Sequence, residues 1–111
     1  MTETSQDIET YQGNDLIITV TVKENGIAKI ITDCTVTWVL YDDQLATVLT
    51  KTVGHGIAIT ATPGVFTITL DGEDTEELLG LYTHEAAVTD KSLNVATVME
   101  GMVEVKYAQA T

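Results

Sequence analysis

The sequence predicts an all-β protein, a sandwich of about seven to eight antiparallel strands. Threonine occurs 20 times and valine 12 times, and such β-branched residues suit the pleated, half-buried surface of a sheet. Segments of alternating apolar and polar residues recur with turn residues about every 8–12 positions, which is the spacing of a sandwich. Only one short stretch favours helix.

The first half of the chain contains three predicted strands. Apolar side chains alternate in Leu16–Val22, and the next residues, Asn25-Gly26, accept positive φ and mark a tight turn. In Cys34–Tyr41 one face carries the side chains of Cys34, Val36, Trp38 and Leu40. The apolar residues of Leu45–Val53 are split between the two faces, which favours an edge strand.

The next region predicts a hairpin followed by a crossover. Gly54-His55-Gly56 forms a flexible turn, and Thr62-Pro63-Gly64 separates two alternating runs, 57–60 and 66–70. The stretch Asp71–Leu79 has acidic residues early and ends before Gly80, which predicts one helical turn between the two sheets.

The last two predicted strands are Tyr82–Thr89 and Val95–Tyr107. The final strand leaves two alternatives open. If it is regular, one face carries Val95, Met99, Val103, Val105 and Tyr107. If it bulges at Gly101, Ala96 and Val98 join Val103 and Val105 instead.

Two details favour an immunoglobulin-like sandwich. Trp38 lies centrally in an early strand, where such cores keep a large aromatic residue, and Phe66 is a second core aromatic. The segment Leu78–Tyr82, which includes Gly80, has the form of a tyrosine corner, in which the Tyr82 hydroxyl returns to the backbone of the crossover. With only one cysteine in the chain, Trp38 is expected to pack on aliphatic side chains alone.

The expected organisation is a single sandwich domain over residues 11–108. Residues 1–10 are expected to form an N-terminal arm or edge strand, and residues 109–111 a C-terminal tail. Cys34 stands alone and is expected to act as a small core hydrophobe rather than as a nucleophile or metal ligand.

Composition excludes several classes of function. Seventeen acidic residues face five lysines and no arginine, which gives a net charge of −12, so contacts to nucleic-acid phosphates or to an anionic membrane are disfavoured. No apolar run reaches the ~18 residues that span a bilayer, and the N-terminus does not resemble a signal peptide. The acidity either maintains solubility or complements a basic protein partner.

The sequence predicts no catalytic, cofactor-binding or metal-binding residues. His84 is expected to be a structural histidine in a strand, and His55 a solvated turn residue. The run Asp71-Gly72-Glu73-Asp74 is the best acidic cluster, but it lacks EF-hand spacing, so weak calcium binding there stays an open alternative.

Apolar residues outside the expected core indicate an interface. The candidates lie opposite the core face or on the expected edge strand: Ile17, Val39, Tyr41, Leu45 and Leu49. Ile30-Ile31 also lacks an obvious partner. These residues either pack between the sheets or dock on another subunit through a sheet face or edge.

The order of motifs along the chain is similar to that of the immunoglobulin-like N-terminal domain of tailed-phage upper-baseplate proteins and of short stand-alone virion relatives. The matching segments run from the Gly-Asp-like turn to the last strand: 11–15, 30–38, 56–60, 64–68, 74–75, 80–85 and 101–105. Each motif is weak alone and only the ordered set is specific. The turn at Asn25-Gly26 lacks the usual proline, and Asp33 stands where a glycine is typical.

The resemblance implies a non-enzymatic structural protein of a tailed-phage virion, made in the host cytoplasm. The chain ends at Thr111, where a baseplate adaptor would continue, so head decoration or cementing is favoured over baseplate or tail attachment. The expected partners are capsid or tail and baseplate subunits, with the chain forming a homo-oligomer or bound to a lattice. A carbohydrate- or receptor-binding module is the alternative from another class.

Overall fold

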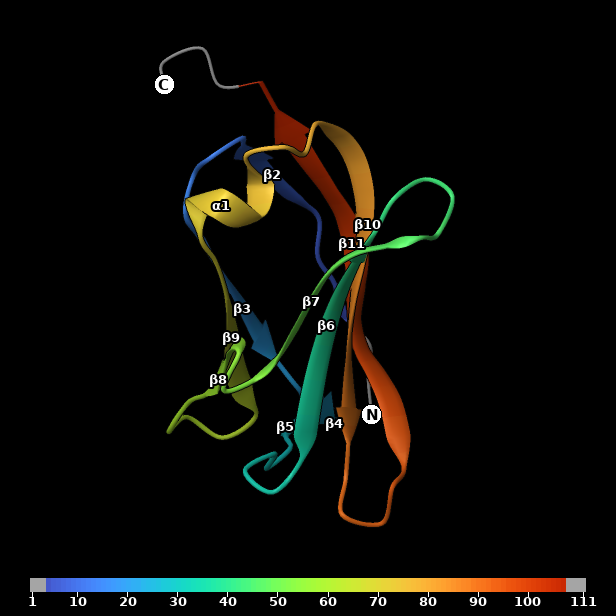
Figure 1. The fold of residues 1–111 in the computed structure, drawn as a ribbon. Coiled ribbons are helices and arrows are strands. Elements are labelled where there is room, and N and C mark those ends of the chain that lie inside the picture. The colour runs from blue at the N-terminus through green and yellow to red at the C-terminus, as the bar shows by residue number, and fades with distance from the viewer. Residues whose placement is uncertain (1–3, 108–111) are drawn as a thin grey trace.

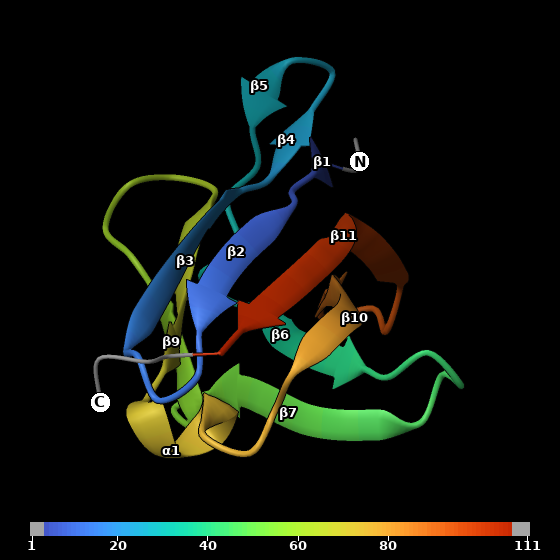
Figure 2. The same ribbon diagram turned by 90° about the horizontal axis from the view of Figure 1, so that it is seen from above.

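The computed structural model describes residues 4–107, and its strands form two layers that face each other (Figures 1 and 2). Strands account for 60% of the residues and helix for 4%, which confirms the predicted all-β sandwich. One layer contains, in spatial order, β2 (Ile8–Tyr11), β11 (Val95–Lys106), β10 (Gly80–Thr89), β6 (Thr35–Tyr41) and β7 (Thr47–Val53), with the two-residue β1 (Thr4–Ser5) also beside β11. The other layer contains β8 (Gly56–Ile59), β9 (Val65–Leu70) and β3 (Leu16–Thr21).

The strand order is that of an immunoglobulin-like sandwich. The two layers meet at one side, where Thr52 and Val53 of β7 pair in parallel with Gly56 and Ile57 of β8. Strand β2, which precedes β3 in the chain, pairs with the last strand, β11, and not with β3. Strand β3 therefore lies at the end of its own layer.

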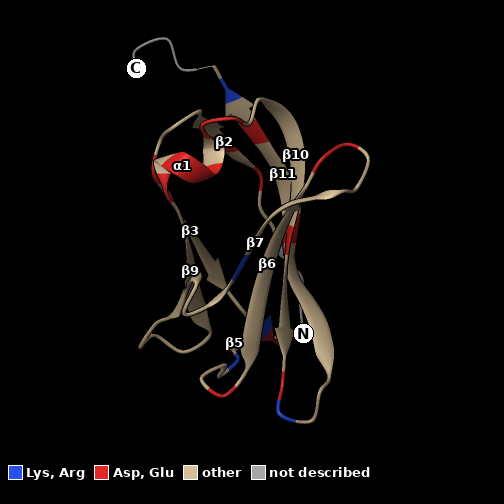
Figure 3. Ribbon diagram, in the orientation of Figure 1, with Lys and Arg blue, Asp and Glu red and all other residues tan. Residues whose placement is uncertain are grey.

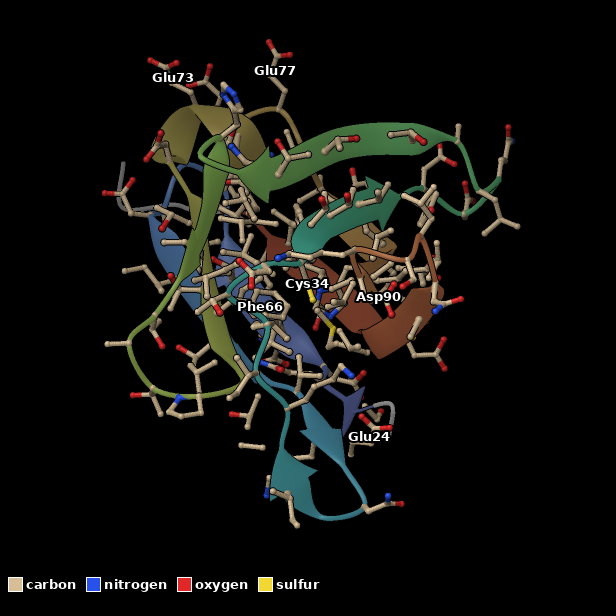
Figure 4. The ribbon with its side chains drawn as sticks, turned by 90° about the horizontal axis from the view of Figure 1, so that it is seen from below. Glu24, Cys34, Phe66, Glu73, Glu77 and Asp90 are labelled. Carbon is tan, nitrogen blue, oxygen red and sulfur yellow. The ribbon has the colours of Figure 1, made fainter. Side chains whose placement is uncertain are left out.

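The core lies between the layers and follows the alternation of the strands. Trp38 and Phe66 are fully buried, as are Val36, Ile68 and Val88. Figure 4 shows Phe66 in this interior with Cys34 nearby, and Cys34 is half-buried against the core. Ile31, which the sequence left without a partner, is 1% exposed and belongs to the core, whereas Ile30 is exposed.

The connections follow the predicted turn chemistry. Asn25 and Gly26 have φ of 54° and 79° and form the two-residue turn between β4 (Lys23–Glu24) and β5 (Ile27–Ala28). The predicted hairpin is formed by β8 and β9. The crossover between the layers contains the short helix α1 (Gly72–Thr75).

The last strand differs from both predicted alternatives. Its register with β10 shifts between Ala86, opposite Met99, and Ala87, opposite Thr97, so that Val98 is the extra residue of a bulge. Val98 and Met99 are consecutive and both fully buried, while Val95 and Tyr107 are exposed. The bulge therefore occurs where two adjacent apolar side chains both enter the core, and not at Gly101.

The N-terminal segment lies along β11. Thr4 pairs with Met99 and Ile8 pairs with Val103, both in parallel. Between the two paired stretches lie Gln6 and Asp7, which belong to neither strand. The predicted C-terminal tail, residues 109–111, lies outside the described residues.

Candidate functional site

A buried polar network joins the centre of the core to the N-terminal segment. The Trp38 indole N–H donates to His84 Nδ1 over 3.1 Å, and the two rings meet edge to face at 6.1 Å. His84 Nε2 lies 2.6 Å from the Gln6 carbonyl oxygen. Trp38 thus has a polar ring as its partner, which corrects the expectation that it packs on aliphatic side chains alone.

This arrangement fixes the protonation state of His84. Because Nδ1 accepts a hydrogen bond, the single proton of the neutral ring must lie on Nε2, which donates to Gln6. Burial lowers the pKa of His84, whereas the Gln6 carbonyl and the Asp7 carboxylate act in the opposite direction. Leu40 of β6 and Gly101 of β11, which flank His84 in the sheet, bring no charge. The ring is fully buried with both nitrogens engaged, so it serves structure and not proton transfer to a substrate.

Tyr82 forms the predicted corner at the start of β10. Its hydroxyl accepts a hydrogen bond from the Leu79 N–H at 3.1 Å and donates to the Leu79 carbonyl at 3.3 Å. Gly80 between them has a φ of 103°, which a residue with a side chain rarely adopts. His84, two residues after the corner tyrosine, occupies the position at which antibody domains carry the second cysteine of their disulfide.

The turn before β3 docks on the crossover. Asp15 Oδ1 accepts the Gly72 N–H at 2.8 Å, and the Gly13 N–H donates to Thr75 Oγ1 at 3.1 Å. A Cβ atom on Gly72 would lie 2.5 Å from the Gly13 carbonyl oxygen, so this close approach requires glycine. The Gly-Asp turn therefore ties the start of β3 to α1.

The acidic cluster at 71–74 is tied into the fold. Asp74 Oδ2 accepts both the Asp71 N–H at 2.8 Å and the Lys51 ammonium at 2.9 Å. Glu73 and Glu77 project outward from this end of the molecule (Figure 4). Within residues 4–107 no three His, Cys, Asp or Glu side chains lie close enough together to hold a metal ion.

A small hollow lies between the segments 30–32 and 59–64, with a volume of about 110 Å³. Ligand pockets usually enclose about 300–1,000 Å³. The hollow is therefore smaller than a typical small-molecule site. His55, in the turn between β7 and β8, is exposed and lies outside its lining.

The largest candidate site is the outer face of the layer formed by β11, β10, β6 and β7. Cross-strand pairs define three rows of side chains on it, mostly threonine with valine, alanine, tyrosine and methionine: Thr50–Val39–Glu85–Glu100, Tyr41–Thr83–Met102, and Thr52–Thr37–Ala87–Thr97. We call these three rows the outer face.

The charges of this outer face are unusual. Glu85 and Glu100 stand directly opposite each other, and like charges in such a pair destabilise a sheet by about 0.2–1 kcal/mol. Glu9 and Glu104 form a second such pair beside it, but Lys106 lies 3.3 Å from Glu9. In the described part of the chain no cation forms an ion pair with Glu85 or Glu100. Figure 3 shows acidic segments along β10 and β11 and few basic ones.

The predicted interface residues are divided among several surfaces. Val39 and Tyr41 lie on the outer face and are half-buried. Ile17 is 65% exposed but belongs to β3, in the other layer. Leu49 is partly buried and packs against the core, which fits the alternative in which these residues pack between the sheets.

Leu45 lies in the turn between β6 and β7, and Leu93 occupies the equivalent position in the turn between β10 and β11. Leu93 was not identified as a candidate from the sequence. Leu45 and Leu93 have φ of 63° and 65° and are 74% and 81% exposed. In each turn an aspartate, Asp42 or Asp90, caps two following backbone N–H groups. The repeated spacing Asp-x-x-Leu after a strand is the signal that could have identified Leu93.

No protein-family model matches the sequence, and no curated protein is similar to it. Among the helices of residues 4–107, none is long and apolar enough to cross a membrane.

Proposed function

We propose that this chain is a non-enzymatic structural protein of a tailed-phage virion, which attaches to other virion proteins through the outer face. The virion role is proposed from the order of sequence motifs, which is similar to that of tailed-phage virion proteins. The outer face is the proposed contact surface, and the single observation that carries it is the Glu85–Glu100 pair, which lies in the middle one of its three threonine-rich rows.

The chemistry of the partner follows from this pair. A lysine or arginine placed against the two carboxylates would relieve their repulsion, and charge complementarity of this kind sets specificity and association rate. Val39 lies beside Glu85 in the same row and offers an apolar contact next to the charges. The partner surface is therefore basic with an apolar centre.

Co-sedimentation tests the proposal. Purified protein is mixed separately with heads and with tails of the phage that encodes it. We expect it to pellet with heads, and pelleting with tails alone would move the proposal to baseplate or tail attachment. Protein that stays in the supernatant with both particles would overturn the virion role.

Charge reversal tests the surface. The double variant Glu85→Lys/Glu100→Lys should pellet at least about tenfold less, because it places cations against a basic partner. The matched control is Glu73→Lys/Glu77→Lys, which changes the net charge equally at the α1 end of the molecule and should pellet as the parent does. Equal losses in both variants would point to net charge and not to the outer face.

A further inference from the structure

Strand β3 leaves one edge of the smaller layer open. It lies at the end of the strand order and pairs with β9 alone. The Val22 N–H donates to the Gly64 carbonyl at 2.7 Å, and the Val22 carbonyl accepts from Lys29 at 2.9 Å, so even-numbered positions turn their backbone groups toward β9 and β5. The backbone N–H and C=O groups of successive residues point to opposite sides of a strand in an antiparallel sheet. Those of Ile17, Thr19 and Thr21 therefore point away from β9, toward the open edge.

The open edge is almost unoccupied. Among the described residues, the hydrogen bond that reaches these outward backbone groups comes from Gln6 Nε2 to the Thr19 carbonyl, at 3.4 Å, which is long for such a bond. Natural edge strands are usually protected by a charge, a proline or a bulge. The segment Leu16–Thr21 has none of these, and its odd-numbered side chains are exposed.

We infer that this edge pairs, antiparallel, with β3 of a second copy of the chain. Backbone direction allows only odd positions to bond with odd positions across the contact. If Thr19 lies opposite Thr19 of the second copy, Ile17 lies opposite Thr21, and Asp15 lies opposite Lys23. Thr–Thr and opposite-charge pairs both favour a cross-strand contact.

The positions of the charged residues favour the Thr19-centred register and a second copy of the chain as the partner. In a two-fold contact centred on Ile17 or on Thr21, Asp15 no longer faces Lys23, so only the Thr19-centred register forms two opposite-charge pairs. Asp15 and Lys23 are both exposed. The outer face, by contrast, would bring glutamate against glutamate in a pair of copies. The uncharged β3 edge is therefore where this strongly acidic chain meets itself at the lowest electrostatic cost.

The oligomeric state tests the contact. Because a single added strand pair buries little area and belongs to the weak class of interfaces, sedimentation equilibrium should extend to about 1 mM protein. We expect a monomer–dimer equilibrium that Thr19→Lys abolishes, since two like charges then meet at the axis. Thr69→Lys, on the neighbouring strand β9, is the matched control and should dimerise as the parent does. A monomer at every concentration, or equal loss in both variants, would overturn the inference.

Cysteine cross-linking tests the register, in a Cys34→Ala background. Opposed residues of a hydrogen-bonded antiparallel pair have Cα atoms about 5.5 Å apart, within the range of a disulfide. Thr19→Cys should form covalent dimers on the order of tenfold faster than Ile17→Cys alone, because position 17 faces position 21. A mixture of Ile17→Cys with Thr21→Cys should restore fast cross-linking. If Ile17→Cys alone links as fast as Thr19→Cys, the register is wrong. The dimer does not depend on the virion role, and these results distinguish it from the pelleting experiments.

Discussion

Replacing Gly101 with alanine should detach the N-terminal segment from the body of the sandwich. A Cβ atom at this position would lie 2.0 Å from the Gln6 carbonyl oxygen, so the segment must move by more than about 1 Å before the contact is tolerable. That movement breaks the hydrogen bond to His84 Nε2, now 2.6 Å long. It also disturbs the bonds from Gln6 N to Glu100 O at 2.9 Å and from Met102 N to Asp7 Oδ1 at 3.0 Å.

The cost can be worked from these contacts. A buried N–H left without an acceptor costs about 1–3 kcal/mol, and each of the other two bonds contributes about 1 kcal/mol, for a total of about 3–5 kcal/mol. At about 4 °C per kcal/mol, Tm should fall by roughly 10–20 °C. Trp38 is the single tryptophan and is fully buried, so its fluorescence follows urea unfolding directly.

The control for Gly101→Ala is the same substitution in a variant that lacks residues 1–7. There the added methyl group meets no carbonyl, and the free energy of unfolding should change by less than about 0.5 kcal/mol. A full-length Gly101→Ala that is as stable as the parent would refute the reasoning, and so would an equal loss in both backgrounds.

Three further predictions use the same urea assay. Because the pKa of His84 is lower in the folded protein, the unfolded chain protonates this imidazole first as the pH falls. The contribution of neutral His84 to the free energy of unfolding is therefore complete above about pH 6.5 and decreases below it. The variant His84→Gln, whose side chain donates and accepts hydrogen bonds without titrating, should lose less stability than the parent between about pH 7 and pH 5. Lys51→Met breaks the ion pair with Asp74, whose two side chains are 15% and 18% exposed, and should lower the free energy of unfolding by about 1–3 kcal/mol. Lys91→Met breaks the pair with Asp33, whose side chains are 74% and 70% exposed, and should lower it by less than about 0.5 kcal/mol. Similar losses in the two variants would contradict the argument that burial strengthens the first pair. Tyr82→Phe removes both corner hydrogen bonds and should cost about 1 kcal/mol, and Tyr41→Phe, on the outer face, should be close to neutral.

The sequence predicted the parts of the fold that depend on local periodicity and turn chemistry. Alternation located β3, β6 and β9, and the Asn25-Gly26 dipeptide located a two-residue turn, because both signals act over a few residues. The Tyr82 corner was equally local, since its hydroxyl reaches a backbone only three residues away.

Features that join distant segments could not be predicted in this way. His84 was recognised as structural, but its partner Trp38 is 46 residues away and Gln6 is 78 residues away, and no spacing rule connects them. Gly101 was noticed as a possible bulge, while the actual requirement is the Gln6 carbonyl that passes over it. Leu49 shows the same limit, because an edge strand whose apolar residues lie on both faces does not reveal which of them reaches the core.

The parallel pairing of β1 and β2 with β11 also has a consequence for the order of folding. Asp7 and Met102, which are bonded in the finished molecule, are 95 residues apart in the chain. Closing so long a loop costs entropy before any contact repays it, and non-local pairing of this kind slows folding. Strands β1 and β2 can therefore pair only after β11 has formed, and the core around His84 is completed only when the N-terminal segment pairs with β11. We expect the final and slowest step of refolding to be the docking of the N-terminal segment.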